Sequence, residues 1–353
     1  MTTMKAIRHV GLHTFPELKD IERPTPGPTE VLLKVAGSGA CHSDVAIFDE
    51  FGESSPAVYH REFTLGHEIT GWVEEAGSAA EGFEKGDAYL VYGPLGCGRC
   101  SMCVRGDMLQ CRNRAANTPA GIGLGRDGGM AEYVTVPARN LVPLGDADPI
   151  AASALADAGL TPYHAIKKAL PTLNQGGQYV LVIGLGGLGL LGIQILKAMT
   201  SATIIATDTK ESALQEAERL GAVTVASDDD VVDNILAATG GKGIDAAFDF
   251  VGLGQTVSTA MATVGPDSRV TVVGLGNGSP YEFAWLTSPR ETELISTYWG
   301  TLPELHELVE LFRDGYLEPM YTTYPLSEGL EAYRKLQAGE VSGRAVIVPH
   351  GNA

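Results

Sequence analysis

The chain has 353 residues and a mass of 37.1 kDa, which is enough for two domains at about 100–200 residues per domain. Its 25 Lys and Arg against 43 Asp and Glu give a formal net charge of −18, which excludes nucleic acid and anionic membrane as main partners. A hydrophobic fraction of 44% excludes a disordered chain.

No membrane-spanning helix is expected, because the longest apolar run, residues 179–195, is interrupted by five glycines. Residues 1–5 lack the apolar stretch of a signal peptide, so we expect a cytoplasmic protein. In a reducing compartment, five cysteines indicate metal binding or catalysis rather than disulfides.

Short apolar runs separated by glycine and proline characterise residues 1 to about 150. Frequent turn signals between short strands predict a barrel-like β domain. The runs are Val31–Val35, Ile69–Val73, Tyr89–Tyr92 and Tyr133–Val136.

Two residues of metal-ligating types, one at the end of an early strand and one 26 positions later, stand in this domain. Cys41 follows Gly37-Ser38-Gly39-Ala40, and His67 stands in Gly66-His67-Glu68. A thiolate and an imidazole make half of a zinc site, although a core cysteine and a hydrogen-bonded histidine explain these residue types equally well. Asp157 is one candidate for a third ligand, and the N-cap of a helix over 160–169 is its other interpretation. Three protein ligands would leave one position for substrate.

Four further cysteines lie within fifteen residues, spaced Cys97-x2-Cys100-x2-Cys103-x7-Cys111. Four thiolates suit a tetrahedral zinc ion, and a site with four protein ligands is closed and structural. An iron–sulfur cluster and a redox pair are the alternatives.

From about residue 178 the pattern changes to alternating strands and helices. Near-continuous apolar strands between helices predict a parallel sheet covered on both faces. The expected strands are 179–183, 203–207, 223–225, 246–251 and 270–273, and the expected helices are 188–199 and 212–220. Two more helices, 304–313 and 327–337, and a strand, 345–348, follow.

A glycine motif, Gly184-Leu185-Gly186-Gly187-Leu188-Gly189, joins the first of these strands to the first of these helices. This context is the one required of a dinucleotide-binding loop, in which amides at the helix start meet a pyrophosphate. Asp208 ends the next strand, where a carboxylate binds the ribose 2′-hydroxyl and favours NAD over NADP. Lys210 nearby weakens that preference, and a purely structural turn with Asp208 as a local cap is the alternative.

With these motifs, the chain resembles zinc-dependent alcohol dehydrogenases of the medium-chain dehydrogenase/reductase family over essentially its whole length. The family pattern matches Gly66-His67-Glu68, Gly71, Gly77 and Ala80, and the cysteine lobe and glycine motif follow in the family's order. Segments 41–44, 92–97, 157–164 and 298–300 are most similar to bacterial secondary-alcohol dehydrogenases.

The resemblance implies an α/β fold in two domains. Residues 1–157 and 296–353 would form a GroES-like β-barrel catalytic domain, with a structural zinc lobe at 93–114. Residues 158–295 would form an inserted NAD-binding Rossmann domain, a doubly wound parallel sheet.

The resemblance also assigns the site residues. It makes Cys41, His67 and Asp157 the ligands of a catalytic zinc, with water, substrate or Glu68 in the fourth position; alternatively, Glu68 orients the site. Ser43 matches the proton-relay hydroxyl, with a local turn as the alternative, but Ala46 replaces the histidine that ends some relays. Residues expected to contact the cofactor are His42, Thr161, Val251, Val273 and Leu275, and those expected to line the substrate pocket are Ala46, Leu124, Leu275, Tyr298 and Trp299.

The implied function is reversible hydride transfer between NAD(H) and an alcohol or ketone, with two zinc ions per chain. The small side chain of Ala46 favours secondary alcohols and ketones, including aryl ketones. Alternatives are a family member acting on primary alcohols, aldehydes or polyols, the metal-free reductase branch, and a non-catalytic nucleotide-binding protein. The family also implies a homodimer or homotetramer, paired through strands near residues 294–297.

Overall fold

The computed structural model describes residues 2–51, 62–114, 119–276 and 288–351. The chain folds into two compact units. The first comprises Met1–Ala158, Gly300–Arg313 and Pro319–Ala353, and the second comprises Gly159–Trp299 and Asp314–Glu318. The second unit is therefore an insertion within the first.

The first unit is built mostly on antiparallel strands around an apolar core, with β17–β18 and β7–β8 as parallel pairs. Its largest sheet has the order β10-β6-β5-β3-β18-β17, and β9 pairs with β3 beside this path. These strands are β3 (Glu30–Ala40), β5 (Glu68–Ala76), β6 (Ala88–Val91), β9 (Tyr133–Pro137), β10 (Leu141–Pro143), β17 (Tyr321–Pro325) and β18 (Arg344–Val348). A second sheet pairs β2 (Glu17–Glu22), β1 (Thr3–His9) and β4 (Phe63–Thr64), and a third pairs β7 (Gly121–Ile122) with β8 (Gly125–Arg126).

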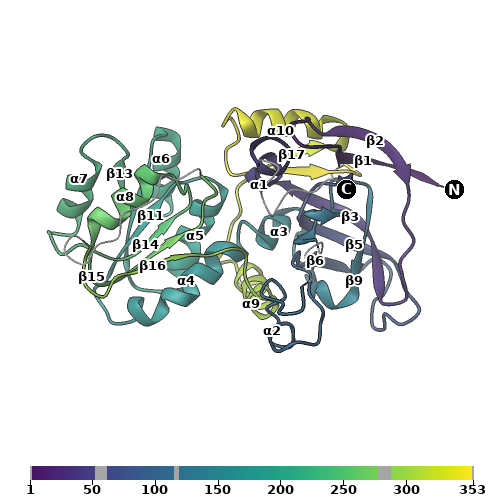
Figure 1. Ribbon diagram of the computed structural model, residues 1–353, viewed down its shortest axis with the longest axis horizontal. Helices are drawn as coiled ribbons and strands as arrows, with labels where there is room; N and C mark the ends of the chain where they lie inside the picture. The colour runs from purple at the N-terminus through teal and green to yellow at the C-terminus, as the bar shows by residue number, and fades with distance from the viewer. Residues whose placement is uncertain (1, 52–61, 115–118, 277–287, 352–353) are drawn as a thin grey trace. The chain divides into compact units, whose positions relative to one another are not determined.

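The C-terminal strand β18 lies between the early strand β3 and the late strand β17. Figure 1 shows this as yellow strands beside purple ones. β18 is buried along its whole length, and Ala345, Val346 and Ile347 pair with Ala40, Gly39 and Ser38 of β3. Residues more than 300 positions apart therefore complete one core.

Short helical segments connect the strands of the first unit. A helical turn α1 (His42–Val45) continues directly into a π-helical turn, Ala46–Glu50. The others are α2 (Ser101–Val104), α3 (Pro149–Ala152), α9 (Leu302–Arg313) and α10 (Gly329–Gln337), with 3₁₀ turns at Ala138–Asn140, Ser153–Ala156 and Leu326–Glu328. The final helix begins two residues later than we expected, because residues 326–328 form one of these 3₁₀ turns.

The second unit is a parallel sheet with the order β13-β12-β11-β14-β15-β16. The strands are β11 (Tyr179–Ile183), β12 (Thr203–Asp208), β13 (Val223–Ala226), β14 (Ile244–Asp249), β15 (Val264–Val272) and β16 (Glu293–Ser296). Numbered within the unit, this is the 3-2-1-4-5-6 order of a dinucleotide-binding sheet, whose crevice opens where the order reverses, between β11 and β14. The predicted strand 246–251 ends two residues early, at Asp249, where the chain turns towards a helix.

One helix of the second unit precedes its first strand and the others each follow a strand, and the apolar side chains between helices and sheet form its core. They are α4 (Leu160–Leu173), α5 (Gly187–Met199), α6 (Glu211–Arg219), α7 (Val231–Ala238) and α8 (Gly254–Thr263), as Figure 1 shows. No helix in the described part of the chain has the length and apolar character needed to cross a membrane.

Candidate active site and metal centres

Three side chains of the first unit, Cys41, His67 and Asp157, converge in its interior. Cys41 directly follows β3, His67 directly precedes β5, and Asp157 follows the 3₁₀ turn at 153–156. The Asp157 Oδ2 lies 3.6 Å from the Cys41 Sγ and 3.5 Å from the His67 Nε2. All three residues are buried, and their ligand atoms lie within 4.8 Å of one another.

This geometry fits a zinc ion. With ligand bonds of about 2.0–2.3 Å and tetrahedral angles, ligand atoms lie roughly 3.3–3.8 Å apart, which matches both measured separations. A thiolate, an imidazole and a carboxylate are also ligands that zinc accepts. Helix α4 begins at Leu160 with Gly159 at its N-cap, so the alternative role for Asp157 as a helix cap is wrong.

Asp44 contacts both the imidazole of His67 and the backbone of Cys41. Its Oδ1 lies 3.1 Å from the His67 Nδ1, and its Oδ2 accepts a hydrogen bond from the backbone N–H of Cys41 at 3.1 Å. With Nδ1 donating to a carboxylate, Nε2 is left with a lone pair for a metal.

The electrostatic surroundings of the imidazole favour a positive charge. Burial alone would lower the pKa of His67, but the neighbouring carboxylates of Asp44 and Asp157 raise it above its ordinary value. A divalent cation would satisfy the same negative groups.

Glu68 is bound elsewhere. It forms a buried two-point ion pair with Arg344 of β18, with Nη2 to Oε1 at 2.5 Å and Nε to Oε2 at 3.2 Å. Its Oε1 also accepts a hydrogen bond from the backbone N–H of Ala158 at 3.1 Å, directly after Asp157. This arrangement suits a carboxylate that orients the segment carrying Asp157.

Ser43 and His42 occupy adjacent positions with different exposure. The Ser43 Oγ lies 3.1 Å from the His67 Nε2, beside the atom that would face a metal. His42 is exposed to solvent. Of these two residues, Ser43 is therefore the one that the fold places at the cluster.

Asp44, Tyr333 and Arg344 were missed by sequence reasoning as site residues. Asp44 lies within the quoted segment 41–44, and its spacing from Cys41, at the third residue of a helical turn, could have indicated its role. Tyr333 and Arg344 lie 289 and 276 residues from the partners they contact, so no local pattern indicates them.

The four-cysteine cluster also assembles as its spacing predicts. Sulfur–sulfur separations are 3.6 Å for Cys100–Cys103, 4.0 Å for Cys97–Cys103 and 4.0 Å for Cys100–Cys111. Four sulfurs around a zinc ion lie about 3.8 Å apart, so the cluster fits this metal. Backbone N–H groups, that of Cys103 foremost, lower the pKa of Cys100 to about 6, which favours the thiolate.

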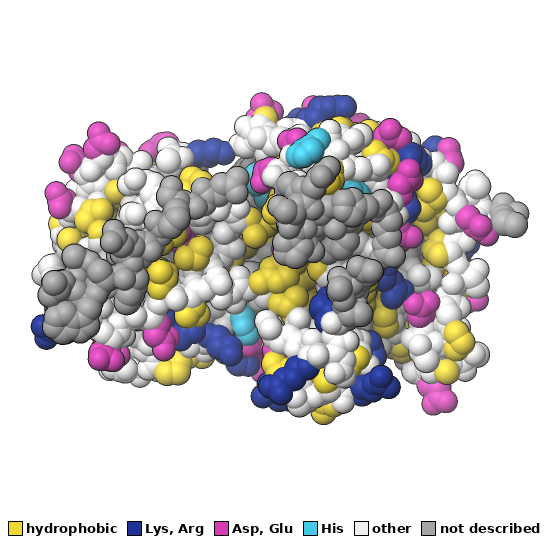
Figure 2. Space-filling view, in the orientation of Figure 1, with side chains coloured by type: hydrophobic (Ala, Val, Ile, Leu, Met, Phe, Trp, Pro, Cys, Tyr) yellow, Lys and Arg dark blue, Asp and Glu magenta, His cyan; other side chains and the backbone are white. Residues whose placement is uncertain are grey.

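The lobe around this cluster is tied down by hydrogen bonds to its backbone. Arg114 donates to the carbonyl oxygens of Leu95 at 2.6 Å and Pro119 at 2.8 Å, and the N–H of Leu302 donates to Gly106 at 2.9 Å. Figure 2 shows dark blue side chains around the position of α2, and Arg99, Arg105 and Arg112 of the lobe are exposed. The lobe thus presents a basic surface on an acidic chain.

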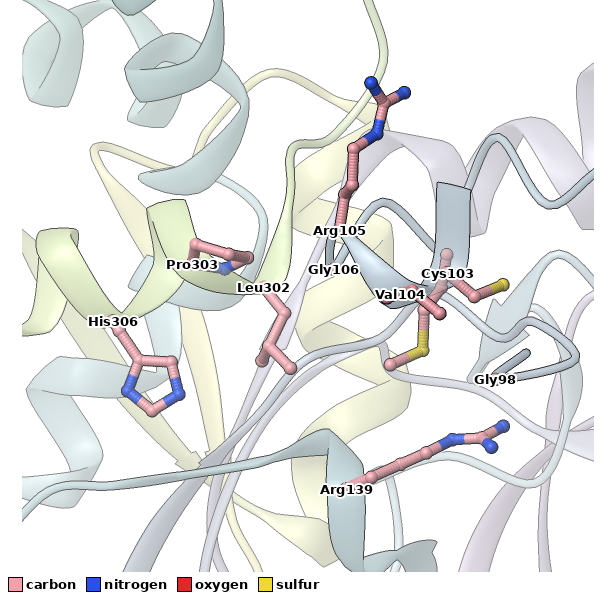
Figure 3. Close-up of a pocket in the computed structure, with 10 residues that line it drawn as sticks. Gly98, Cys103, Val104, Arg105, Gly106, Arg139, Leu302, Pro303 and His306 are labelled. Atoms are coloured by element: carbon pink, nitrogen blue, oxygen red, sulfur yellow. The ribbon is translucent and has the colours of Figure 1, made fainter. Parts of the chain in front are cut away.

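A pocket of about 740 Å³ lies between the lobe and the start of α9. Gly98 and Cys103 line it from the lobe, Arg139 from the neighbouring 3₁₀ turn, and Pro303 and His306 from α9 (Figure 3). In Figure 3 the charged ends of Arg105 and Arg139 extend away from each other and do not converge on one point. This pocket is separate from the Cys41 cluster, none of whose three residues lines it.

In the second unit, the glycine motif forms the turn between β11 and α5. Gly184 has a φ of +86°, and a Cβ on Gly189 would lie 2.0 Å from the carbonyl oxygen of Gly184, so neither position accepts a side chain. A Cβ on Gly186 would meet nothing within 4 Å, which leaves open space at the start of the helix. Gly187 and Leu188 then form the first residues of α5, whose N-terminus suits a pyrophosphate.

Asp208 ends β12 and contacts this loop. Its Oδ2 accepts a hydrogen bond from the N–H of Leu185 at 2.7 Å, and its Oδ1 accepts one from the N–H of Lys210 at 2.9 Å. Val251 lies against Gly184, and Val273 is buried just after β15. These residues all follow carboxyl ends of parallel strands, the edge where such sheets bind nucleotides.

Thr161 and the residues expected to line the substrate pocket are divided between the two units. In the first, Ala46 and Leu124 are buried. In the second, Thr161 is buried in α4, Leu275 and Tyr298 are 49% and 41% exposed, and Trp299 is 0% exposed. Their contacts with cofactor or substrate stay a prediction.

Comparisons with known proteins agree with both units. A model of the alcohol dehydrogenase GroES-like domain matches residues 27–146, and one of the zinc-binding dehydrogenase domain matches residues 187–314. The NAD-dependent alcohol dehydrogenase of Sulfurisphaera tokodaii is 34% identical, covering 98% of this chain and 100% of that protein.

Two solved structures share the whole architecture. The alcohol dehydrogenase of Aeropyrum pernix has a TM-score of 0.89 and 35% identity, covering 98% of this chain and 100% of that one. The acetophenone reductase of Geotrichum candidum in complex with NAD has a TM-score of 0.82 and 33% identity, covering 99% and 98%.

Proposed function

Because the chain belongs to the family of zinc-dependent, medium-chain alcohol dehydrogenases, we propose that its substrates are secondary alcohols and ketones with an apolar or aryl substituent. The chain is an NAD-dependent enzyme of this family, and a small alcohol is its class of substrate. The preference for secondary alcohols over primary alcohols and polyols is the proposal.

The two bound groups would supply the reactive chemistry. Cys41, His67 and Asp157 would hold a zinc ion, which would supply a Lewis acid for the substrate oxygen, and NAD would supply the hydride acceptor. We place NAD at the Gly184–Gly189 turn, with Asp208 accepting from its ribose.

The residues of the chain then position the substrate and move its proton. Ser43, 3.1 Å from the His67 Nε2, would accept the proton of the alcohol hydroxyl. The side chain of Ala46 has no group that could pass the proton on. The proton would therefore leave Ser43 to water or to the ribose of the cofactor. Asp44 would keep the His67 Nε2 aimed at the metal, and Glu68 with Arg344 would hold the Asp157 segment.

The observation that carries the substrate proposal is the small side chain at position 46. Ala46 lies one helical turn after Ser43, so both face the same side of the helix. A methyl group takes up less volume there than an aromatic side chain would, so we infer that the site accepts a second carbon substituent. The likeness to an acetophenone reductase, an enzyme named for an aryl ketone, supports the same conclusion.

A substrate panel tests this proposal. Ethanol, 2-propanol, 1-phenylethanol, acetophenone and a polyol would be compared by kcat/KM, following NADH. We expect kcat/KM for the secondary alcohols and for acetophenone to be at least tenfold higher than kcat/KM for ethanol and the polyol. Equal or better turnover of ethanol or the polyol would overturn the assignment.

Replacing Ala46 by phenylalanine should narrow the substrate range. The larger side chain fills the space that the aryl ring needs, so kcat/KM for acetophenone should fall by about 10–100-fold, and by much less for acetone. Ala46→Ser is the matched control, because it adds only one atom. An unchanged ratio between the two ketones would contradict the pocket assignment.

Replacing Asp208 by asparagine should shift cofactor preference. Asparagine can still accept from the N–H of Leu185, but it removes the negative charge that repels a 2′-phosphate. We expect the kcat/KM ratio of NADP to NAD to rise by roughly 10–100-fold, since a hydrogen bond to a charged group contributes about 1.5–3 kcal/mol. Lys210→Ala should lower the kcat/KM ratio of NADP to NAD. If neither variant changed this ratio, the ribose of the cofactor would have to bind away from Asp208.

We also propose that the enzyme is a cytoplasmic homo-oligomer. All five cysteines are free thiols, and their proposed use as metal ligands needs a reducing compartment. Strand β16, at one edge of the parallel sheet, is the candidate for pairing between copies. Sedimentation would distinguish a monomer from the dimer or tetramer expected.

A further inference from the structure

We propose that Tyr333 is a positioning residue for the Cys41 cluster, acting through Asp44 from the other end of the chain. The Tyr333 hydroxyl donates a hydrogen bond to the Asp44 Oδ2 at 3.0 Å. The same carboxylate holds the His67 ring and the backbone N–H of Cys41. One buried hydroxyl therefore acts on a carboxylate that contacts two of the three candidate ligands.

The surroundings require this hydroxyl to be a donor. Tyr333 and Asp44 are each 0% exposed, so water does not replace the bond if it is lost. Burial and the neighbouring Asp44 raise the pKa of Tyr333 well above its ordinary value, so its oxygen keeps the proton. Without that proton donor, the Asp44 Oδ2 would keep only the hydrogen bond from the backbone N–H of Cys41. The carboxylate could then rotate away from His67.

Helix α10 carries Tyr333 and contacts the segment 42–50 at further points. The Tyr333 ring packs edge-on against Phe48, with ring centroids 5.9 Å apart. One turn later, the Gln337 side chain donates to the Asp49 Oδ2 at 3.0 Å. The hydroxyl of Tyr333 is the one of these contacts that reaches the carboxylate behind the metal ligands.

Tyr333→Phe separates this role from packing, because it removes only the hydroxyl. Carboxylates and their partners behind metal ligands typically affect metal affinity by about 10–100-fold. We therefore expect zinc affinity at the Cys41 cluster, measured by competition with a chelator, to fall by about tenfold or more. Zinc at the four-cysteine cluster should be unaffected, and alcohol oxidation should be lost at limiting zinc and recover at saturating zinc.

Tyr92→Phe is the matched control. Tyr92 is also fully buried, and its hydroxyl donates to the carbonyl oxygen of Gly300 at 2.7 Å, with no contact to Asp44. Tyr92→Phe should lower the melting temperature by about as much as Tyr333→Phe does. Its zinc affinity at the Cys41 cluster should stay within twofold of wild type. Equal zinc affinities in both variants would overturn the proposal and leave Tyr333 a packing residue.

A second pair of variants tests the route through Asp44. If Tyr333 acts only through this carboxylate, adding Tyr333→Phe to Asp44→Asn should change zinc affinity by less than twofold. A further tenfold loss would contradict that route. The inference rests on zinc binding by Cys41, His67 and Asp157, and a wild-type protein that holds zinc only at the four cysteines would refute that proposed function instead.

Discussion

Replacing Cys41 by serine should abolish alcohol oxidation and remove one of two zinc ions per chain. The thiolate is the softest of the three candidate ligands, and its Sγ lies 3.6 Å from the Asp157 Oδ2 across the proposed metal position. Lewis-acid activation lowers the activation free energy by several kcal/mol, and each step of about 1.4 kcal/mol corresponds to a factor of ten in rate. The expected loss in kcat/KM is therefore roughly 10³-fold or more, measured together with zinc content.

The matched control for this variant is Ser43→Ala. Ser43 belongs to the same helical turn and contacts His67, but it is not a candidate ligand. This control should retain both zinc ions and lose activity only through the proton path. If Cys41→Ser kept two zinc ions and normal turnover, the catalytic assignment of the whole cluster would be wrong.

Replacing Cys100 by serine should unfold the lobe at residues 93–114 and lower the stability of the first unit. The sulfur of Cys100 contacts those of Cys103 and Cys111. Within the lobe, the regular secondary structure is the short helix α2, which by itself stabilises the lobe little. Zinc binding to such small folds contributes about 10–16 kcal/mol in isolated peptides, so losing even a third of that is several kcal/mol. At roughly 2–4 °C per kcal/mol, we expect the melting temperature to fall by about 10 °C.

Thermal unfolding and limited proteolysis would measure this effect. Ser101→Ala changes the exposed neighbouring residue and should leave the melting temperature within about 2 °C, since surface substitutions change stability by about 0.5 kcal/mol. Cleavage of Cys100→Ser should map to the lobe. A variant with one zinc ion and wild-type resistance to heat and protease would show that the lobe is stable without its metal.

The features found from the sequence are those encoded locally. The four cysteines lie within fifteen residues, and the glycine motif joins a strand to the helix that follows it, so spacing alone indicates both sites. Asp157 is a candidate on residue type, and the family resemblance implies that it is a ligand. The structure places its Oδ2 3.5 Å from the His67 Nε2, a separation that fits this prediction.

Two of the three site residues that were missed, Tyr333 and Arg344, depend on distant pairing. Arg344 reaches Glu68 because β18 pairs with β3, and β3 pairs with β5, which begins at Glu68. Tyr333 reaches Asp44 through the packing of α10 on segment 42–50. The π-helical turn at Ala46–Glu50 has no propensity signal, because its residues would suit an ordinary helix.

The position of β18 between β3 and β17 in the first unit's sheet has a consequence for biosynthesis. This strand and Arg344 leave the ribosome only after the whole inserted second unit has been translated. The second unit can therefore fold while the polypeptide is still growing, whereas the Glu68 carboxylate waits for its counter-charge until Arg344 has been translated. Nascent chains of this enzyme should thus acquire nucleotide-binding competence before they acquire a complete metal pocket.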